Sequence, residues 1–103
     1  MRVFTDYAGR RVRLTAERED HIAEHPEMAE LLDGLADVIG APERAVRSAS
    51  DPMVELLYEF RRGTKVGDKW LCVVIKYLTN DAFVVTAYLT DKIKQGENLW
   101  AKK

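Results

Sequence analysis

The stretch that decides the fold runs Trp70-Leu71-Cys72-Val73-Val74-Ile75-Lys76-Tyr77-Leu78 and, after Thr79-Asn80-Asp81, continues Ala82-Phe83-Val84-Val85-Thr86-Ala87-Tyr88-Leu89-Thr90. Both apolar runs are rich in β-branched and aromatic residues, which favour strands. The three residues between them have the chemistry of a turn. The stretch therefore predicts an antiparallel hairpin at the centre of the only sheet.

Within this hairpin, side chains should alternate between the two faces of the sheet. In the second strand, strict alternation places Phe83, Val85, Ala87 and Leu89 on one face, and Ala82, Val84, Thr86, Tyr88 and Thr90 on the other. In the first strand, Lys76 falls in register with Trp70, Cys72 and Val74. A lysine at this position must extend its ammonium group to solvent, form an ion pair with a carboxylate, or bind an anion.

The rest of the chain adds strands and helices in separate blocks. Residues 44–49 and 53–60 read as two more strands, and residues 3–5 and 11–14 as a short hairpin. Thr15 is placed to cap a helix that runs to about His25, and Pro26 can begin a second helix that reaches Ile39. The tail with Leu99 and Trp100 is expected to pack against the domain. The predicted class is α+β: a short N-terminal hairpin, two helices, then a four-stranded antiparallel meander with the helices on one sheet face.

Composition narrows the class of protein. The 103 residues are 47% hydrophobic and 32% charged, which is typical of one globular domain spanning residues 1–103. The lone Cys72 offers no disulfide, and no leader or membrane-spanning run is present, so a cytoplasmic location is expected. The net charge of −1 hides a segregation: residues 15–43 carry one basic and nine acidic residues, and residues 44–103 carry eleven basic and seven acidic ones. A polyanion would be steered toward the sheet.

Several side chains have the chemistry that phosphodiester cleavage without a metal requires. His21 and His25 fall on one face of the first predicted helix, where they could act as base and acid. A fixed cation would stabilise the developing charge, and hydroxyl groups would hold the phosphate. The candidate catalytic residues are His21, His25, Lys76, Thr86 and Tyr88, and the candidate substrate-binding residues are Arg18, Arg47, Thr90 and Lys92.

Other interpretations of these residues stay open. Two histidines four residues apart could bind zinc, but a structural site needs four ligands and the only cysteine lies in a predicted buried strand, so no metal is expected. The histidines could instead pack at the junction of helix and sheet. Lys76 could be a solvated stem, and Thr86 a residue that merely favours a strand.

Three segments resemble a known family. Residues 18–28 contain the paired histidines before Pro-Glu, and residues 84–97 contain Thr-x-Tyr-x-Thr-Asp-Lys-x-Lys. The third segment is residues 46–51. They look like the small phage-associated domains grouped with the barnase, EndoU, colicin and RelE nuclease fold. The resemblance covers about Val3 to Trp100. It implies metal-independent RNA cleavage by attack of a ribose 2′-hydroxyl, with the histidines as base and acid, Lys76 or Arg47 stabilising the phosphorane, and Thr86 and Tyr88 positioning it.

The sequence thus favours an endoribonuclease without a cofactor, with RNA as its substrate. One alternative is a noncatalytic domain that binds protein or RNA through the open sheet face. Another is the toxin of a toxin–antitoxin pair, which would require a neutralising protein partner. The ribonuclease hypothesis requires the histidines and the polar strand residues to meet in one cleft.

Overall fold

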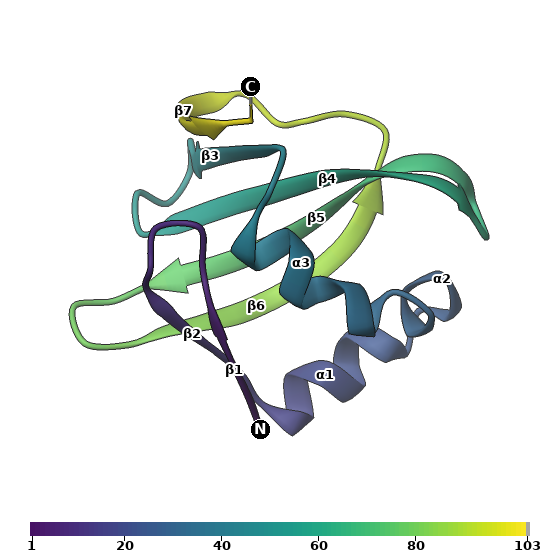
Figure 1. Ribbon diagram of the computed structural model, residues 1–103, viewed down its shortest axis with the longest axis horizontal. Helices are drawn as coiled ribbons and strands as arrows, with labels where there is room; N and C mark the ends of the chain where they lie inside the picture. Colours follow the sequence, from purple (N-terminus) through teal and green to yellow (C-terminus); the bar gives the residue numbers. More distant parts are fainter. Residues whose placement is uncertain (103) are drawn as a thin grey trace.

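The predicted central hairpin lies in the middle of a seven-stranded mixed sheet in the computed structural model, which describes residues 1–102 (Figure 1). The strand order is β1-β2-β6-β5-β4-β3-β7. All neighbours are antiparallel except β2 and β6, which are parallel and share the register pair Arg13 and Phe83. The strands are β1 Arg2–Thr5, β2 Arg11–Leu14, β3 Arg44–Ser48, β4 Val54–Thr64, β5 Gly67–Tyr77, β6 Ala82–Thr90 and β7 Gly96–Ala101.

The prediction of a four-stranded meander with a separate hairpin and two helices is wrong, although the protein is broadly α+β. The N-terminal hairpin of β1 and β2 joins the same sheet by pairing with β6. The predicted tail becomes β7, which pairs with β3 and supplies the far edge. Both additions satisfy backbone groups that a free meander would leave unpaired at its edges, since β3 and β6 would otherwise be outermost.

The helical layer begins as predicted and then breaks. Helix α1 (Ala16–Ala23) is capped by Thr15, whose Oγ1 accepts from the Arg18 N–H at 3.2 Å. The predicted helix over residues 26–39 is instead α2 (Pro26–Ala29), a 3-10 turn (Leu32–Gly34) and α3 (Leu35–Gly40). Gly34 lowers helix stability at the break.

No helix within residues 1–102 is long and apolar enough to cross a membrane.

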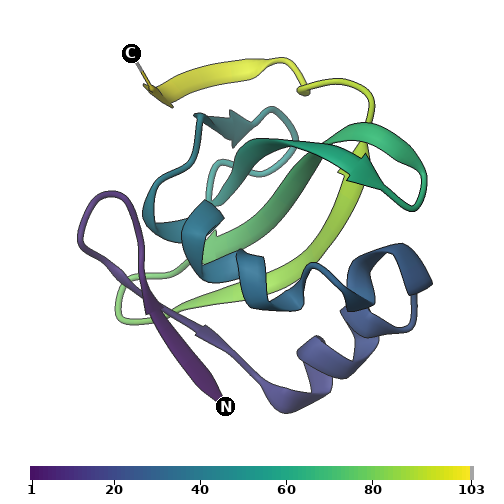
Figure 2. The same ribbon diagram turned by 45° about the vertical axis from the view of Figure 1, so that its right-hand side comes forward.

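One face of the sheet packs against the helices and forms the main core (Figures 1 and 2). Met28 from α2 and Leu35, Val38 and Ile39 from α3 are all buried in it, together with Ile22 from α1. The break between α2 and α3 lets each short helix turn its apolar side toward the strands. From the sheet, the same core receives Val12, Leu14, Ala45, Leu57, Leu71, Val73, Ile75, Ala82, Val84 and Ala87.

The opposite face carries a smaller core of its own. Val46, Leu56, Tyr58 and Cys72 are buried there, although no helix covers them. Ile93, in the connection from β6 to β7, packs onto this cluster. The backbone N–H of Lys94 donates to the Tyr58 hydroxyl at 3.1 Å. We call this side of the sheet the helix-free face; the connection crosses part of it and leaves the remainder open.

A β-bulge changes which side chains of β6 share a face. Val74 pairs with Thr86, but the next residue of β5, Ile75, pairs with Val84, so Val85 is an extra residue in β6. Ala82 and Val84 therefore pack in the main core, whereas Tyr88 packs on the helix-free face. The predicted grouping of Ala82 and Val84 with Thr86, Tyr88 and Thr90 is wrong, because strict alternation does not hold across a bulge.

Candidate functional site

The two histidines lie on the solvent side of the helical layer. The side chains of His21 and His25 are 58% and 67% exposed, and their Nδ1 atoms lie 3.5 and 3.8 Å from Glu24 and Glu27 carboxylates. Beside His21 a hollow of about 310 Å³ is lined by Glu17, Arg18, Asp20, His21 and Glu24. With three carboxylates in its wall, this hollow is a poor site for a phosphate.

Lys76 and the β6 hydroxyl residues lie on the helix-free face. Lys76 Nζ is 3.2 Å from Asp51 Oδ2, and the Met53 N–H together with Lys76 lowers the pKa of that carboxyl. Tyr88 stands beside the buried Cys72 thiol in the sheet, and burial raises the pKa of its hydroxyl. Thr86 and Thr90 occupy register positions opposite Val74 and Trp70 on the same face. Lys76 therefore has the carboxylate partner that a strand lysine needs.

The predicted catalytic residues are thus divided between two sides of the molecule. His21 and His25 stand outside the helices that cover the main core, and Tyr88 packs on the helix-free face of the sheet. Of the predicted substrate-binding residues, the Arg47 side chain is held by Glu97 and the Pro52 carbonyl. The backbone N–H of Lys92 donates to the Thr90 hydroxyl, which orders the backbone there. The structure does not bring the predicted set into one cleft, and their catalytic role stays a prediction.

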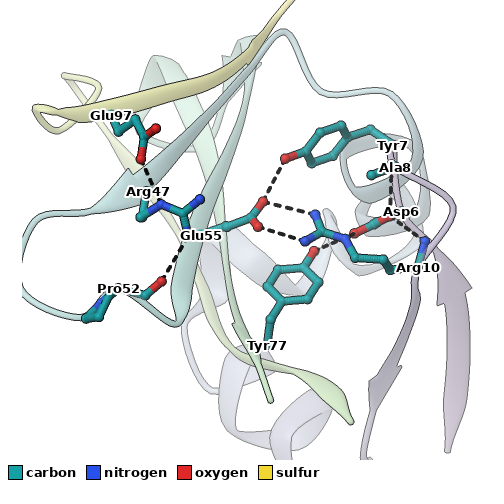
Figure 3. A network of polar contacts seen from close by, with 9 residues as sticks. All are labelled: Asp6, Tyr7, Ala8, Arg10, Arg47, Pro52, Glu55, Tyr77 and Glu97. Atoms are coloured by element: carbon teal, nitrogen blue, oxygen red, sulfur yellow. Dashed lines mark hydrogen bonds and ion pairs between the residues drawn. The ribbon is translucent and has the colours of Figure 1, made fainter. Parts of the chain in front are cut away.

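A polar network that the sequence reasoning missed lies where the β1–β2 turn meets β4 and β5 (Figure 3). The Arg10 guanidinium lies between two carboxylates: its Nε is 2.8 Å from Asp6, and its Nη1 is 2.9 Å from Glu55. The Tyr7 hydroxyl donates to Glu55, and the Tyr77 hydroxyl donates to Asp6, both at 2.7 Å. The guanidinium carbon stands 3.9 Å from the centre of the Tyr77 ring.

This network fastens the N-terminal hairpin to the sheet. Asp6 and Glu55 are only 4% and 5% exposed, and buried carboxylates require such partners. Burial and the bond to Glu55 raise the pKa of Tyr7 to about 12, and burial and Asp6 raise that of Tyr77 further. Because every carboxylate oxygen has a donor, we assign the network a structural role. Its signal in the sequence was Glu55, a charged residue inside an apolar strand.

A groove on the helix-free face has different chemistry. A hollow of about 390 Å³ is lined by Glu43, Arg44, Trp70, Ile93 and Lys102. A second, of about 300 Å³, is lined by Arg44, Ile93, Lys94, Gln95, Gly96 and Asn98. The two share Arg44 and Ile93, so we treat them as one groove and call it the Arg44 groove. Three basic residues and one acidic residue stand among the lining residues.

The cations of this groove have few partners of their own. Arg44 donates from Nη2 to the Asn98 side-chain oxygen at 2.6 Å, while its Nε is buried without a hydrogen-bond partner within residues 1–102. Over the same residues, Arg44, Lys94 and Lys102 form no ion pair with a carboxylate. By contrast Lys69, Lys76 and Arg47 are each paired. The groove therefore offers an added anion three positive charges that no carboxylate within the described residues already neutralises.

In the part of the chain that the structure describes, no three His, Cys, Asp or Glu side chains gather as a metal site would require. Sequence reasoning did not find the Arg44 groove, because its basic residues come from the start of β3, from the residue after β7 and from the connection between β6 and β7. The only signal was the excess of basic residues after position 44.

Comparison of the chain with known protein families, curated proteins and solved structures finds no match.

Proposed function

We propose that this domain binds RNA in the Arg44 groove on the helix-free face of its sheet and does not cleave it. The observation that carries the proposal is the set of three cations, Arg44, Lys94 and Lys102, which line connected hollows and lack carboxylate partners within residues 1–102. The predicted cleavage chemistry has less support, because the histidines stand on the other side of the molecule. Binding without cleavage needs only the cations.

The groove suits phosphate groups. Arg44 donates to the Asn98 side chain but pairs with no carboxylate within residues 1–102, so its guanidinium can bind a phosphate oxygen without first breaking an ion pair. Lys102 lines one of the two hollows with Arg44 and Lys94 lines the other, and each adds a point charge. If all three contact phosphates, log K should fall with log salt with a slope of about −2, since each contact on a single strand contributes about 0.7. Raising the salt from about 50 to 200 mM should then weaken binding roughly 20-fold.

The near-zero net charge is compatible with this proposal because the charge is segregated. Nine of the acidic residues lie between positions 15 and 43, in and around the helical layer. That layer covers the face opposite to the groove. Repulsion from the helices should therefore orient an approaching polyanion toward the helix-free face.

The first test measures affinity and location together. Fluorescence anisotropy with a labelled 12-nucleotide single-stranded RNA of mixed sequence should detect binding by the wild-type chain. The double variant Arg44→Ala, Lys94→Ala should bind at least tenfold more weakly, because two phosphate contacts are lost. Arg18→Ala is the matched control, since Arg18 is an exposed cation in the acidic hollow beside His21. No binding by the wild type, or equal losses in both variants, would contradict the proposal.

The second test asks whether the RNA survives. The same RNA is incubated with the protein in EDTA at pH 6 to 8 and analysed on a denaturing gel. We expect intact RNA. Cleavage that disappears in both His21→Ala and His25→Ala would overturn the noncatalytic proposal and support the ribonuclease hypothesis, since a histidine base and acid would titrate in this range.

A further inference from the structure

We infer that Trp70 is a stacking platform for an unpaired base, so that the Arg44 groove selects single-stranded RNA over duplex RNA. This inference rests on the proposed function and adds the form of RNA that the groove accepts. Trp70 lines the larger hollow with Arg44 and Lys102 and is only partly buried. An aromatic ring between unpaired cations is the arrangement that proteins use for single strands, where bases stack and phosphates pair with cations.

The neighbours of Trp70 hold its ring without stacking on it. The Tyr58 ring lies 6.4 Å away at 89° to the indole plane, and the Phe60 ring lies 5.2 Å away at 72°. Tyr58 is fully buried and anchored by the Lys94 N–H. These steep contacts fix the orientation of the indole, and neither aromatic neighbour lies parallel to it as a stacked base would.

Phe60 of β4, the aromatic neighbour of Trp70, lies next to another cation. The Arg62 guanidinium carbon stands 5.6 Å from the centre of the Phe60 ring, next to the turn between β4 and β5. Arg62 is exposed and forms no ion pair within the described residues 1–102. The order along this part of the face is therefore Arg44, Trp70, Phe60 and Arg62. A single strand lying along it would find a cation on each side of the two rings.

Duplex RNA does not fit this arrangement. In an A-form helix the bases are stacked on one another, and the major groove is too deep and narrow for a side chain to reach them. A tryptophan that forms the wall of a hollow can stack only on a base that is already free. The cations alone would bind both forms of RNA, so a preference for single strands is the distinguishing consequence of the Trp70 platform.

The experiment uses the two tryptophans of the chain, Trp70 and Trp100. Trp100→Phe leaves Trp70 as the only indole, and Trp70→Phe leaves Trp100, whose Nε1 donates to the Pro42 carbonyl and which does not line the groove. Tryptophan fluorescence is titrated with a 12-nucleotide single strand and with the 12-base-pair duplex of the same sequence. We expect strong quenching by the single strand in Trp100→Phe and none in Trp70→Phe.

Affinities measured by anisotropy complete the design. The wild type should bind the single strand at least tenfold more tightly than the duplex, and Trp70→Ala should lose about tenfold for the single strand only. Thermal melts check that each variant is folded. If Trp70→Ala does not fold, Trp70→Phe, which keeps an aromatic ring, takes its place.

Equal binding of both RNA forms without quenching of Trp70 would overturn the platform while leaving RNA binding intact. Absence of binding to either form would overturn the proposed function itself. A deoxyribonucleotide of the same sequence that binds tenfold more tightly than the RNA would overturn RNA as the occupant.

Discussion

Replacing Glu55 by Gln tests the network that fastens the N-terminal hairpin. Glu55 is 5% exposed and accepts three hydrogen bonds: one from Tyr7 and two from Arg10, at 2.9 and 3.2 Å. The amide of Gln has nearly the same shape but no charge. Its oxygen can still accept from Tyr7, while its NH₂ group would face the N–H groups of Arg10.

The expected loss of stability follows from these contacts. One charge-assisted hydrogen bond contributes about 1.5–3 kcal/mol. Breaking a fully buried ion pair costs about 3–5 kcal/mol, but Arg10 keeps Asp6 as a partner and its side chain is 39% exposed, so the lower range applies. We expect Glu55→Gln to lower the free energy of unfolding by about 2 kcal/mol. For a domain of this size that corresponds to a fall in Tm of roughly 8–16 °C.

The assay is thermal and urea unfolding followed by circular dichroism at pH 7. Glu97→Gln is the matched control, because Glu97 also lies 2.9 Å from an arginine, Arg47, but is 66% exposed. An exposed pair contributes about 0–1 kcal/mol, so on the same scale the control should lose at most about 4–8 °C and should melt above Glu55→Gln. If Glu55→Gln melts as close to the wild type as the control does, the reasoning that the network fastens the hairpin is refuted.

Three further predictions follow from other parts of the structure. Gly96→Ala should destabilise the β3–β7 edge by about 1–3 kcal/mol, because an added Cβ would contact the Arg47 carbonyl oxygen and Val46 Cγ1; urea unfolding checks this, with Gln95→Ala as the neutral comparison. Cys72 is buried and its pKa is raised by that burial to about 11, so iodoacetamide at pH 7.5 should label it only in urea, and rapid labelling of the folded chain would contradict the burial. All four tyrosines have raised pKa values, with Tyr7 and Tyr58 at about 12, so the folded chain should show little tyrosinate absorbance at pH 10.5 while the unfolded chain ionises near pH 10. Because the unfolded state then binds fewer protons than the folded state, the free energy of unfolding should fall as the pH rises above about 10, and a constant value up to pH 12 would show that the tyrosines are not buried as described.

Local chemistry was sufficient to predict the elements whose signals are local. The turn at residues 79–81 joins β5 and β6, and Thr15 caps α1 through a bond to a residue three positions away. Both features depend on side chains that act on their own backbone. The alternation of Val54, Leu56 and Tyr58 in β4 likewise corresponds to one face of the sheet.

The errors arose where a distant partner decides the structure. The segment that forms β7 begins Gly96-Glu97-Asn98, which has no strand pattern, and it is a strand because β3 offers an unpaired edge. The extra residue Val85 is invisible to an alternating pattern, yet it moves Val84 to the main core. The continuous helix expected from Pro26 to Ile39 is instead broken between Ala29 and Leu35, and Met28 before the break and Leu35 after it are both buried in the main core.

For the candidate site, spacing along a helix predicted that His21 and His25 point the same way as Ile22, but Ile22 is buried whereas both histidine side chains are exposed. It could not show which face of the sheet α1 covers, because that depends on how β2 joins β6. The Arg44 groove likewise depends on β7 returning to β3, so that Arg44 and Asn98 meet across 54 positions. The family resemblance remains a hypothesis that the two RNA experiments address.

The parallel pairing of β2 with β6 has a consequence for how this chain is made on the ribosome. Arg13 of β2 reaches its Asp81 partner only after a further 68 residues have been synthesised. At about 5–20 residues per second, the first hairpin waits roughly 3–14 seconds before its place in the sheet exists. During that interval Val12 and Leu14, buried in the finished protein, are exposed to chaperones and to other nascent chains.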